Sequence, residues 1–337
     1  MAALVSVWGA GMLAVALCAG LLWTLLRTRL AWRLAVDTPN WRSMHSMPVP
    51  RVGGWGLIPA ACAATLAFGG FGGLDVTPSM TGVVALAALS FVDDRRGLPA
   101  AVRFAGHFLV AVAFVWSQHV FDTAWPAIVL CVAMVWMTNL YNFMDGLDGL
   151  AGGMALFGFA TYAWVAAGHA PGLALAGAAM AGAALGFLVF NFPPARIFLG
   201  DAGSIPLGFA AAALGVQGWL DHVWPLWFPV MVFSPFIGDA TLTLAKRLVR
   251  REKVWEAHRE HCYQRLARMG FGHRATMLLW YALMAAASLL GIGLLRVAPA
   301  LQYAGVALWY AGLLAAACGV GAAWKRFERQ TNRGGGG

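Results

Sequence analysis

Charged side chains are scarce in this sequence. Asp, Glu, Lys and Arg make up only 11% of the 337 residues, and just 14 residues are Asp or Glu. That scarcity excludes a soluble domain with an ordinary charged surface, and the 61% hydrophobic content excludes a disordered chain. Cysteine is sparse too. The five cysteines are scattered, in spacings that match neither a disulfide framework nor a zinc site.

Long apolar runs fill the chain instead, and runs of about 20 residues match the thickness of a bilayer core. We therefore expect an all-α fold, a polytopic transmembrane helical bundle of about eleven spans forming a single membrane domain over residues 1–333. The first run lacks a basic segment and a clear cleavage site, so it should remain as a helix, and the glycines at 334–337 are typical of a linker. The expected spans are 3–26, 54–74, 79–92, 102–121, 125–143, 150–168, 172–191, 203–220, 223–245, 275–296 and 302–324.

The net charge of +9 would suit a nucleic-acid partner, but its distribution indicates membrane topology. If the N-terminus lies outside and the C-terminus inside, every Lys and Arg except Arg296 falls on the inner side. An excess of Lys and Arg in the inner loops is the rule for membrane proteins. The sequence therefore predicts this orientation, with the inner loops facing the cytoplasm.

The segment from Asn139 to Asp148 places two amides and two carboxylates between two apolar runs. Polar groups at such a junction are costly, which favours a function for them. The alternative is a solvated turn, but a plain turn needs one Asp-Gly pair and this segment has two. If the segment is helical, Asn142, Asp145 and Asp148 share one face. Their oxygens suit Mg²⁺.

Two more polar segments fall on the same predicted side. Asp93 and Asp94 are adjacent carboxylates that favour a cation beside them, although Arg95 and Arg96 could neutralise them at an ordinary helix end. The loop 42–54 combines prolines and glycines, which prevent a continuous helix, with Ser, His and Arg side chains that can donate to phosphate. A loop that serves only topology is the alternative. The candidate donors in this loop are Arg42, His45 and Arg51.

A helix start is predicted at Gly200-Asp201-Ala202-Gly203-Ser204, because two prolines end the preceding run and another apolar run follows. The exposed N–H groups and the positive dipole end of a helix start attract anions. Asp201 can then be a capping residue, or it can be held ready for Mg²⁺ with phosphate at the helix start.

The ninth expected span contains Asp239, and an acid inside an apolar run is expensive unless it is paired. Lys246 and Arg247, two turns on, are candidate partners.

The polar loop 246–274 spaces His258 and His261 three residues apart, which is one helical face. The zinc-protease pattern His-Glu-x-x-His is absent and no third ligand is nearby, so zinc is not expected. Contact of these histidines and Arg259 with phosphate or sugar is one interpretation. A purely solvated amphipathic loop is the other.

Together these motifs resemble one family. Asp93-Asp94, the Asn139-to-Ala151 segment, Phe198-Leu-Gly-Asp-x-Gly-Ser204 and the late histidine loop are similar to those of the polyprenyl-phosphate N-acetylhexosamine-1-phosphate transferases of glycosyltransferase 4 type. The phospho-MurNAc-pentapeptide transferase of peptidoglycan synthesis is a relative. That enzyme carries three consecutive histidines where this chain has His-Arg-Glu-His. The chain therefore resembles more the branch that initiates O-antigen and other surface polysaccharides.

The resemblance implies transfer of a HexNAc 1-phosphate from a UDP-sugar to undecaprenyl phosphate, at the cytoplasmic face of the bacterial inner membrane, with release of UMP. It also implies a need for Mg²⁺, which Mn²⁺ can replace. Members are often dimers, so a homodimer is one arrangement that it allows. Nothing in the sequence selects the sugar.

By motif match, Asp201 and Asn142 are implied as metal ligands. Asp93 or Asp94 is implied to deprotonate the acceptor or, as the alternative, to act as a nucleophile. Asp145 is grouped with the catalytic residues. The uridine is expected near Asp148, Asn191 and Phe198, the phosphates or sugar near His258 and His261, and further substrate contacts at Arg42, His45, Arg51 and Arg259.

A secondary transporter of an anionic solute is the main alternative. Transporters place polar groups on broken helices near the middle of the membrane. Here the acids lie at the inner ends of the expected spans, and Asp239 alone is deeper. That distribution favours an enzyme whose site faces one side of the membrane.

Overall fold

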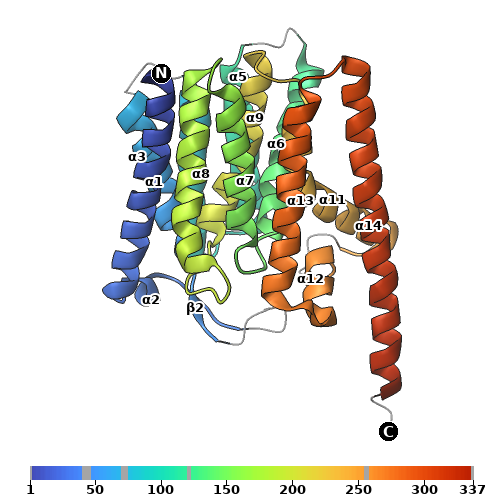
Figure 1. The fold of residues 1–337 in the computed structure, drawn as a ribbon. Coiled ribbons are helices and arrows are strands. Elements are labelled where there is room, and N and C mark those ends of the chain that lie inside the picture. Colours follow the sequence, from blue (N-terminus) through green and yellow to red (C-terminus); the bar gives the residue numbers. More distant parts are fainter. Residues whose placement is uncertain (1, 40–46, 70–74, 120–122, 254–257, 335–337) are drawn as a thin grey trace.

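The structure is a computed structural model that describes residues 2–39, 47–69, 75–119, 123–253 and 258–334. It is a bundle of helices with the two ends of the chain at opposite ends of the bundle (Figure 1). The elements are α1 (Ala2–Arg27), α2 (Leu30–Leu34), β1 (Val36–Asp37), β2 (Val49–Pro50), α3 (Gly53–Gly69), α4 (Thr77–Arg96), α5 (Ala100–Ser117), α6 (Ala124–Phe143), α7 (Leu150–Ala166), α8 (Pro171–Asn191), α9 (Asp201–Leu220), α10 (Trp227–Val232), α11 (Ser234–Val249), α12 (Cys262–Leu266), the π-helical turn η1 (Ala267–Phe271), α13 (Gly272–Leu294) and α14 (Pro299–Gly334).

Seven helical segments of the described residues are long and apolar enough to cross a membrane. The helices α3 and α7 are shorter apolar helices, which brings the supported number to between seven and nine. The two remaining expected spans coincide with α4 and with the consecutive helices α10 and α11. The polytopic helical bundle is confirmed at this level, while the count of eleven and the orientation stay predictions.

The middle of the bundle is built on α8, which packs against α1, α3 and α7. Small residues allow this close packing. A Cβ on Gly182 would lie 2.1 Å from the Gly11 carbonyl oxygen, and one on Gly177 would lie 2.9 Å from the Ala163 nitrogen. Small residues at helix contacts are typical of membrane bundles, where backbones approach closely and van der Waals packing replaces the hydrophobic effect.

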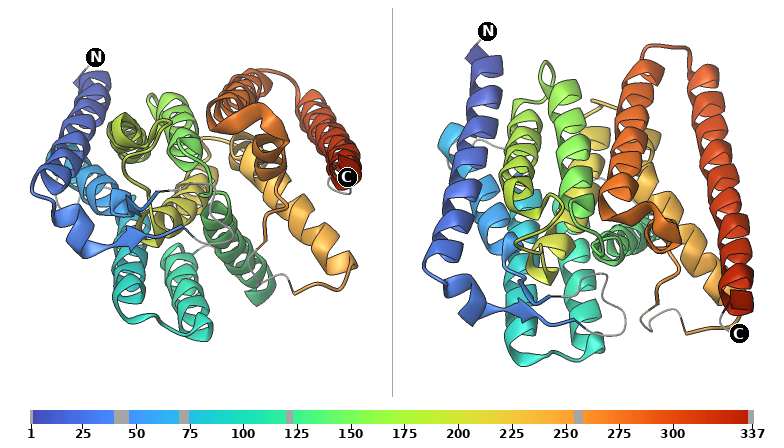
Figure 2. Two further views of the ribbon diagram at one scale, coloured as in Figure 1. Left: turned by 90° about the horizontal axis from the view of Figure 1, so that it is seen from below. Right: turned by 60° about the horizontal axis from the view of Figure 1, so that its bottom comes forward.

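The last helix, α14, lies at the edge of the bundle, both in the view of Figure 1 and when the molecule is seen from below in Figure 2. None of its most apolar 18-residue window is buried. An apolar helix whose surface is mostly left uncovered by protein is suited to a lipid environment rather than to water.

One short ribbon departs from the expected all-α fold. Strands β1 and β2 are antiparallel, with Val36 opposite Pro50 and Asp37 opposite Val49. The Arg51 N–H continues the pairing by donating to the Ala35 carbonyl at 3.1 Å. The ribbon lies at the lower end of the bundle (Figure 1), where prolines and glycines in the sequence prevent a helix.

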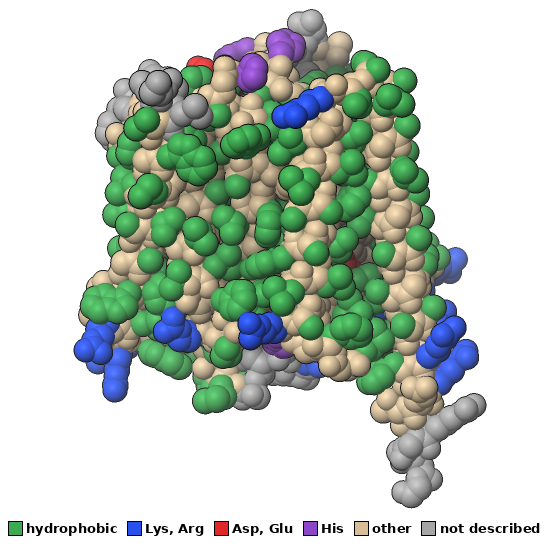
Figure 3. All heavy atoms as spheres, in the orientation of Figure 1, with side chains coloured by type: hydrophobic (Ala, Val, Ile, Leu, Met, Phe, Trp, Pro, Cys, Tyr) green, Lys and Arg blue, Asp and Glu red, His purple; other side chains and the backbone are tan. Residues whose placement is uncertain are grey.

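Lys and Arg side chains gather around the lower end of the molecule, and the flank above them is covered by hydrophobic side chains (Figure 3). This separation follows from the sequence, because the basic residues concentrate in the same set of loops. It matches the band of apolar surface that a bilayer requires.

Candidate functional site

The predicted acids and amides meet at the lower end of the bundle. The Arg103 guanidinium on α5 lies 3.2 Å from Asp93 on α4 and 3.9 Å from Asp201 at the start of α9. The Ser204 hydroxyl, on the first turn of α9, donates to the Asn142 amide oxygen on α6 at 2.6 Å. Four helices therefore bring these residues to one place, although they are far apart in the sequence.

Adjacent Asp93 and Asp94 have different surroundings. Asp93 accepts the Leu98 N–H at 2.7 Å and also contacts Arg103, so both of its oxygens are used. Asp94 lies 3.1 Å from Arg51 through one oxygen, while its other oxygen is buried without a hydrogen-bond partner among the described residues. Asp93 thus holds the turn after α4, whereas one oxygen of Asp94 is left able to accept a hydrogen bond or a proton.

Burial raises the pKa of Asp94 to about 6, with Arg51 opposing the rise and Asp201 and Asp93 adding to it. Since an ordinary Asp titrates near 4, this carboxyl can gain or lose a proton much closer to neutral pH. A titratable group with a perturbed pKa beside other charged side chains is a candidate functional group.

Backbone pairing places Arg51 beside Asp94. The Gly53 N–H donates to the Phe198 carbonyl at 2.9 Å, and the Phe198 N–H donates to the Pro50 carbonyl at 2.8 Å. Phe198 is therefore fixed by its backbone on both sides. Arg42 and His45, predicted from the same loop, lie outside the described residues.

The acid segment is not a continuous helix. Helix α6 ends at Phe143 and α7 begins at Leu150, so Asp145 and Asp148 lie in the loop between them instead of sharing a helical face with Asn142. Gly149 has a φ of 77°, a left-handed conformation that glycine adopts without strain and that turns the chain into α7.

The pKa of Asp145 is raised well above its ordinary value. Desolvation is the largest cause, and the charges of Asp201, Asp148 and Asp37 add to it. Acids from three segments thus raise the pKa of Asp145 together, and their combined negative field favours a bound cation.

The predicted uridine residues Asn191 and Asp148 tie two loops together. The Asn191 amide oxygen accepts the Gly149 N–H at 2.8 Å, and its NH₂ group donates to the Ile197 carbonyl at 2.9 Å. Asp148 accepts the Ala195 N–H at 3.1 Å. Both side chains therefore hold the acid loop against the loop that follows α8.

The structure does not pair Asp239 with either candidate partner, Lys246 or Arg247. Asp239 accepts the backbone N–H groups of Cys262 at 2.8 Å and Tyr263 at 3.3 Å, at the start of α12. Arg247 turns instead to Glu252 and Glu260, each at 3.4 Å. A helix start presents unpaired donors that a carboxylate satisfies well, so it competes successfully with a flexible cation on the same helix.

The histidine loop is not purely solvated. His261 is only 2% exposed, whereas His258 and Arg259 are half-buried. The two histidine rings lie 4.8 Å apart between centroids. Burial, with help from His261 and Arg247, lowers the pKa of His258 to about 4, so this ring is neutral at pH 7.

Sequence reasoning missed several residues that hold the site. Besides Arg103 and Ser204, the Tyr263 hydroxyl donates to the Phe143 carbonyl at 3.3 Å and the Tyr281 hydroxyl donates to the Gly149 carbonyl at 2.9 Å, at the two ends of the acid loop. His273 lies 3.5 Å from Asp148. Tyrosines inside apolar runs look like packing residues in a sequence, and only the tertiary contacts reveal these attachments.

The residues present fit Mg²⁺. Within the described part of the chain, no three Asp, Glu, His or Cys side chains converge closely enough to hold a metal by themselves. Mg²⁺ needs only one or two protein ligands when phosphates and waters complete its shell. The Asn142 amide oxygen, held by Ser204 in the first turn of α9, and the Asp201 carboxylate in that same turn are oxygens of the kind that such a shell uses.

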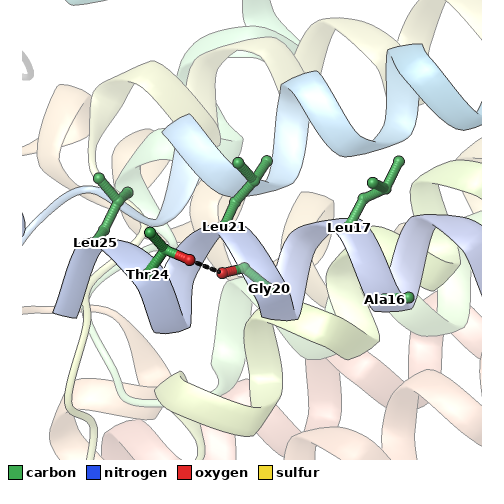
Figure 4. Close-up of a pocket in the computed structure, with 6 residues that line it drawn as sticks. All are labelled: Ala16, Leu17, Gly20, Leu21, Thr24 and Leu25. Atoms are coloured by element: carbon green, nitrogen blue, oxygen red, sulfur yellow. Dashed lines mark hydrogen bonds between the residues drawn. The ribbon is translucent and has the colours of Figure 1, made fainter. Parts of the chain in front are cut away.

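A separate depression runs along α1 and is lined by Ala16, Leu17, Gly20, Leu21, Thr24 and Leu25 (Figure 4). Its one polar side chain, Thr24, donates to the Gly20 carbonyl of the same helix at 2.8 Å. None of the six lining residues is charged, so they offer no cationic group to an anionic substrate. We therefore do not assign this depression to the site.

Comparisons with known proteins point the same way. Glycosyl transferase family 4 matches residues 77–218, which include every candidate acid from Asp93 to Asp201. The probable undecaprenyl-phosphate N-acetylglucosaminyl 1-phosphate transferase of Bacillus subtilis is 31% identical over 288 residues, covering 79% of this chain and 80% of that protein.

Two further relatives differ in how much of this chain they match. The decaprenyl-phosphate N-acetylglucosaminephosphotransferase of Mycobacterium tuberculosis is 30% identical over 299 residues, covering 75% of this chain and 74% of that protein. A phospho-N-acetylmuramoyl-pentapeptide-transferase of Geobacillus thermodenitrificans is 37% identical, but over only 153 residues, which cover 38% of this chain and 47% of that protein.

Proposed function

Since this chain belongs to glycosyl transferase family 4, we propose that it moves an N-acetylhexosamine 1-phosphate from a UDP-sugar to undecaprenyl phosphate and releases UMP. The reaction initiates a lipid-linked glycan. The observation that carries this proposal is the convergence of Asp94, Asn142 and Asp201 at one end of the bundle, through contacts with Arg51, Arg103 and Ser204.

The arrangement suits a reaction between two anions. One reactant is a lipid anchored in the bilayer and the other is soluble, so both can reach only a site at the ends of helices. Phosphoryl transfer is promoted mainly by positioning and by offsetting charge. Arg51 and Arg103 supply positive charge among the acids of this site.

Asn142 and Asp201 are the residues proposed to hold Mg²⁺. When bound there, the ion would neutralise charge that develops on the phosphate oxygens. Ser204 keeps the Asn142 amide oriented, because its hydroxyl donates to the amide oxygen.

In the proposed reaction a phosphate oxygen of the lipid attacks the β-phosphorus of the UDP-sugar. The bond from that phosphorus to the bridging oxygen breaks, and UMP leaves with the oxygen. Asp94 is proposed to accept the remaining proton of the acceptor phosphate, and its second oxygen, unpartnered among the described residues, supports this role. Asp93 has both oxygens occupied, which supports a structural role for it.

The uridine is proposed to lie beside Asp148, Asn191 and Phe198. Because both groups of the Asn191 amide are already used, Asn191 shapes this surface rather than binding uridine itself. The basic lower end of the molecule is proposed to face the cytoplasm. The matches to N-acetylglucosamine 1-phosphate transferases cover 79% and 75% of this chain and the match to the pentapeptide transferase covers 38%, which supports a place among the former.

The test is UMP release by the purified protein in detergent with undecaprenyl phosphate and a panel of UDP-sugars carrying GlcNAc, GalNAc, QuiNAc or FucNAc. We expect UMP with Mg²⁺ and at least one donor, none with EDTA, and recovery when Mg²⁺ is restored in excess. Asp201→Asn should lose about 100-fold or more. Asp221→Asn, a matched change in the turn after α9, at its end farthest from Asp201, should retain normal turnover. Absence of UMP with every donor would contradict the proposal.

A further inference from the structure

A polar pair lies inside the apolar part of the bundle. His107 on α5 and Asn139 on α6 face each other, with 3.3 Å between His107 Nδ1 and the amide nitrogen. His107 follows Arg103, and Asn139 precedes Asn142, so the pair lies about one helical turn farther from the lower end than the site. Both helices are apolar enough to cross a membrane. Polar side chains within such segments are costly, which favours a function for the pair.

The orientation of the Asn139 amide is fixed. Its NH₂ group donates to the Val135 carbonyl at 2.7 Å, and a carbonyl can only accept, so this contact identifies the nitrogen. His107 Nδ1 faces the same NH₂ group and must therefore accept, which leaves the ring neutral with its proton on Nε2. His107 is 4% exposed, so packing holds the ring in place.

One group of this arrangement remains available. Both N–H groups of Asn139 are used, and its amide oxygen has no hydrogen-bond partner among the residues that the structure describes. The side chain is only half-buried. An amide oxygen without a partner is costly in an apolar segment, so a partner for it is expected between the helices.

Contacts between three helices show where that partner would lie. Arg103 on α5 lies 3.9 Å from Asp201 on α9, and Ser204 on α9 donates to Asn142 on α6 at 2.6 Å. The polar pair joins α5 to α6. These contacts link the three helices pairwise, and the pair is the link on the membrane side of the residues proposed to hold Mg²⁺.

From this geometry we propose that Asn139 is a further positioning residue of the metal site. Its amide oxygen accepts a hydrogen bond from a water that Mg²⁺ retains, and His107 acts through Asn139 by fixing the amide. The proposal rests on the proposed function, because it concerns the ion assigned to Asn142 and Asp201. Mg²⁺ keeps several waters when the protein supplies one or two ligands, and groups that orient such a shell are part of a metal site.

A role in packing alone predicts a different result. Hydrogen bonds between membrane helices help to hold the helices together. If that were the only task of the pair, its loss would lower the melting temperature and leave metal affinity unchanged. Metal affinity therefore separates the two roles.

The first measurement is Mn²⁺ binding to the purified protein in detergent, without substrates, from the EPR signal of the free ion. We expect Asn139→Leu and His107→Leu each to weaken binding by about tenfold. In the His107→Leu background, Asn139→Leu should cost less than about twofold, because the amide is no longer fixed. His107→Gln should stay within about twofold of wild type, since its amide oxygen can accept the Asn139 N–H as Nδ1 does.

Unchanged Mn²⁺ affinity in Asn139→Leu would overturn the proposal, and so would a wild-type protein that binds no Mn²⁺. An equal loss from Asn139→Leu in both backgrounds would show that His107 does not act through Asn139. Thr161→Val is the matched control, because Thr161 is also a polar residue of an apolar helix but bonds only to the Phe157 carbonyl of its own helix, at 2.7 Å. It should behave like wild type. Melting temperatures identify any variant that does not fold.

The second measurement is the dependence of UMP release on Mg²⁺. In Asn139→Leu, the KM for Mg²⁺ should rise by about tenfold, while kcat at saturating Mg²⁺ and the KM for the UDP-sugar stay within about threefold of wild type. A lower kcat at every Mg²⁺ concentration, with an unchanged KM for Mg²⁺, would contradict the assignment. UMP release by the wild-type protein shows separately whether the proposed function holds.

Discussion

Asp94 differs from Asp93 only in what it contacts. A paired helix-end acid is an ordinary structural feature, and Asp93 is one, since it holds the turn after α4 and Arg103. The Asp94 side chain is 6% exposed and, among the residues that the structure describes, pairs with one cation, Arg51. A buried carboxylate oxygen without a partner is costly to keep, and such costs are usually retained where a substrate supplies the missing contact.

Asp94→Asn is expected to lower kcat by about 100-fold or more, because a positioned base typically contributes that much. Asp93→Asn should lower the melting temperature more than Asp94→Asn does, and it should lower kcat less than Asp94→Asn does. Burial raises the pKa of Asp94 to about 6, so its basic form is present above pH 6 and lost as the pH falls below it. The acceptor phosphate itself titrates at about the same pH.

The measurement is kcat from pH 5 to pH 8 for both proteins. Activity should fall below pH 6 in each, and the fall should be shallower in Asp94→Asn, where only the phosphate titrates. Near-normal turnover by Asp94→Asn would remove the base role.

At the scale of elements, the site depends on two helix starts in contact. The first turn of α3 touches the first turn of α9, and the Gly54 N–H donates to the Leu199 carbonyl at 2.9 Å. A Cβ on Gly54 would lie 2.3 Å from the Gly203 nitrogen. Backbone cannot move aside as a side chain can, so glycine is required here, and the position of Asp201 depends on it.

Gly54→Ala is therefore expected to push the starts of α3 and α9 apart, at a cost of about 1–3 kcal/mol, and to reduce UMP release by about tenfold. Gly319→Ala on α14 is the matched control, because a Cβ there meets nothing within 4 Å. Melting temperature and turnover are compared for both. If Gly54→Ala matched the control in both measurements, the close contact would not matter for the site.

The whole molecule separates charge from apolar surface. Lys and Arg side chains gather at the end that contains the site (Figure 3), and Arg296 is the one basic residue assigned to the other side. Basic residues flanking spans set the orientation of a membrane protein, because they are retained on the cytoplasmic side. The site and the cytoplasm should therefore be on the same side.

Orientation is tested with single cysteines in a cysteine-free background that retains UMP release. An impermeant maleimide should label Arg296→Cys in intact cells. It should label Arg33→Cys and Arg329→Cys only after the cells are permeabilised. Labelling of Arg33→Cys in intact cells would reverse the predicted orientation and would place the donor site away from the cytoplasmic UDP-sugar.

The sequence by itself determined the membrane class, the helical bundle, the family and the set of acids at one end of the spans. These are properties of local runs, because a bilayer selects for the length of an apolar segment and the charge beside it. The short Gly-Asp-x-Gly-Ser and Asp-Gly motifs are specific enough to identify relatives without any knowledge of contacts.

Only the tertiary structure decided how the acids divide their roles. The sequence offered Lys246 and Arg247 on the same helix as candidate partners for Asp239, and it instead accepts two backbone N–H groups at the start of α12. Asp145 and Asp148 lie in a loop, and the β1–β2 ribbon interrupts the helices. Pairing depends on which helix ends the packing brings together. A buried carboxylate takes the donors it finds there, and the identity of its neighbours in the chain does not reveal them.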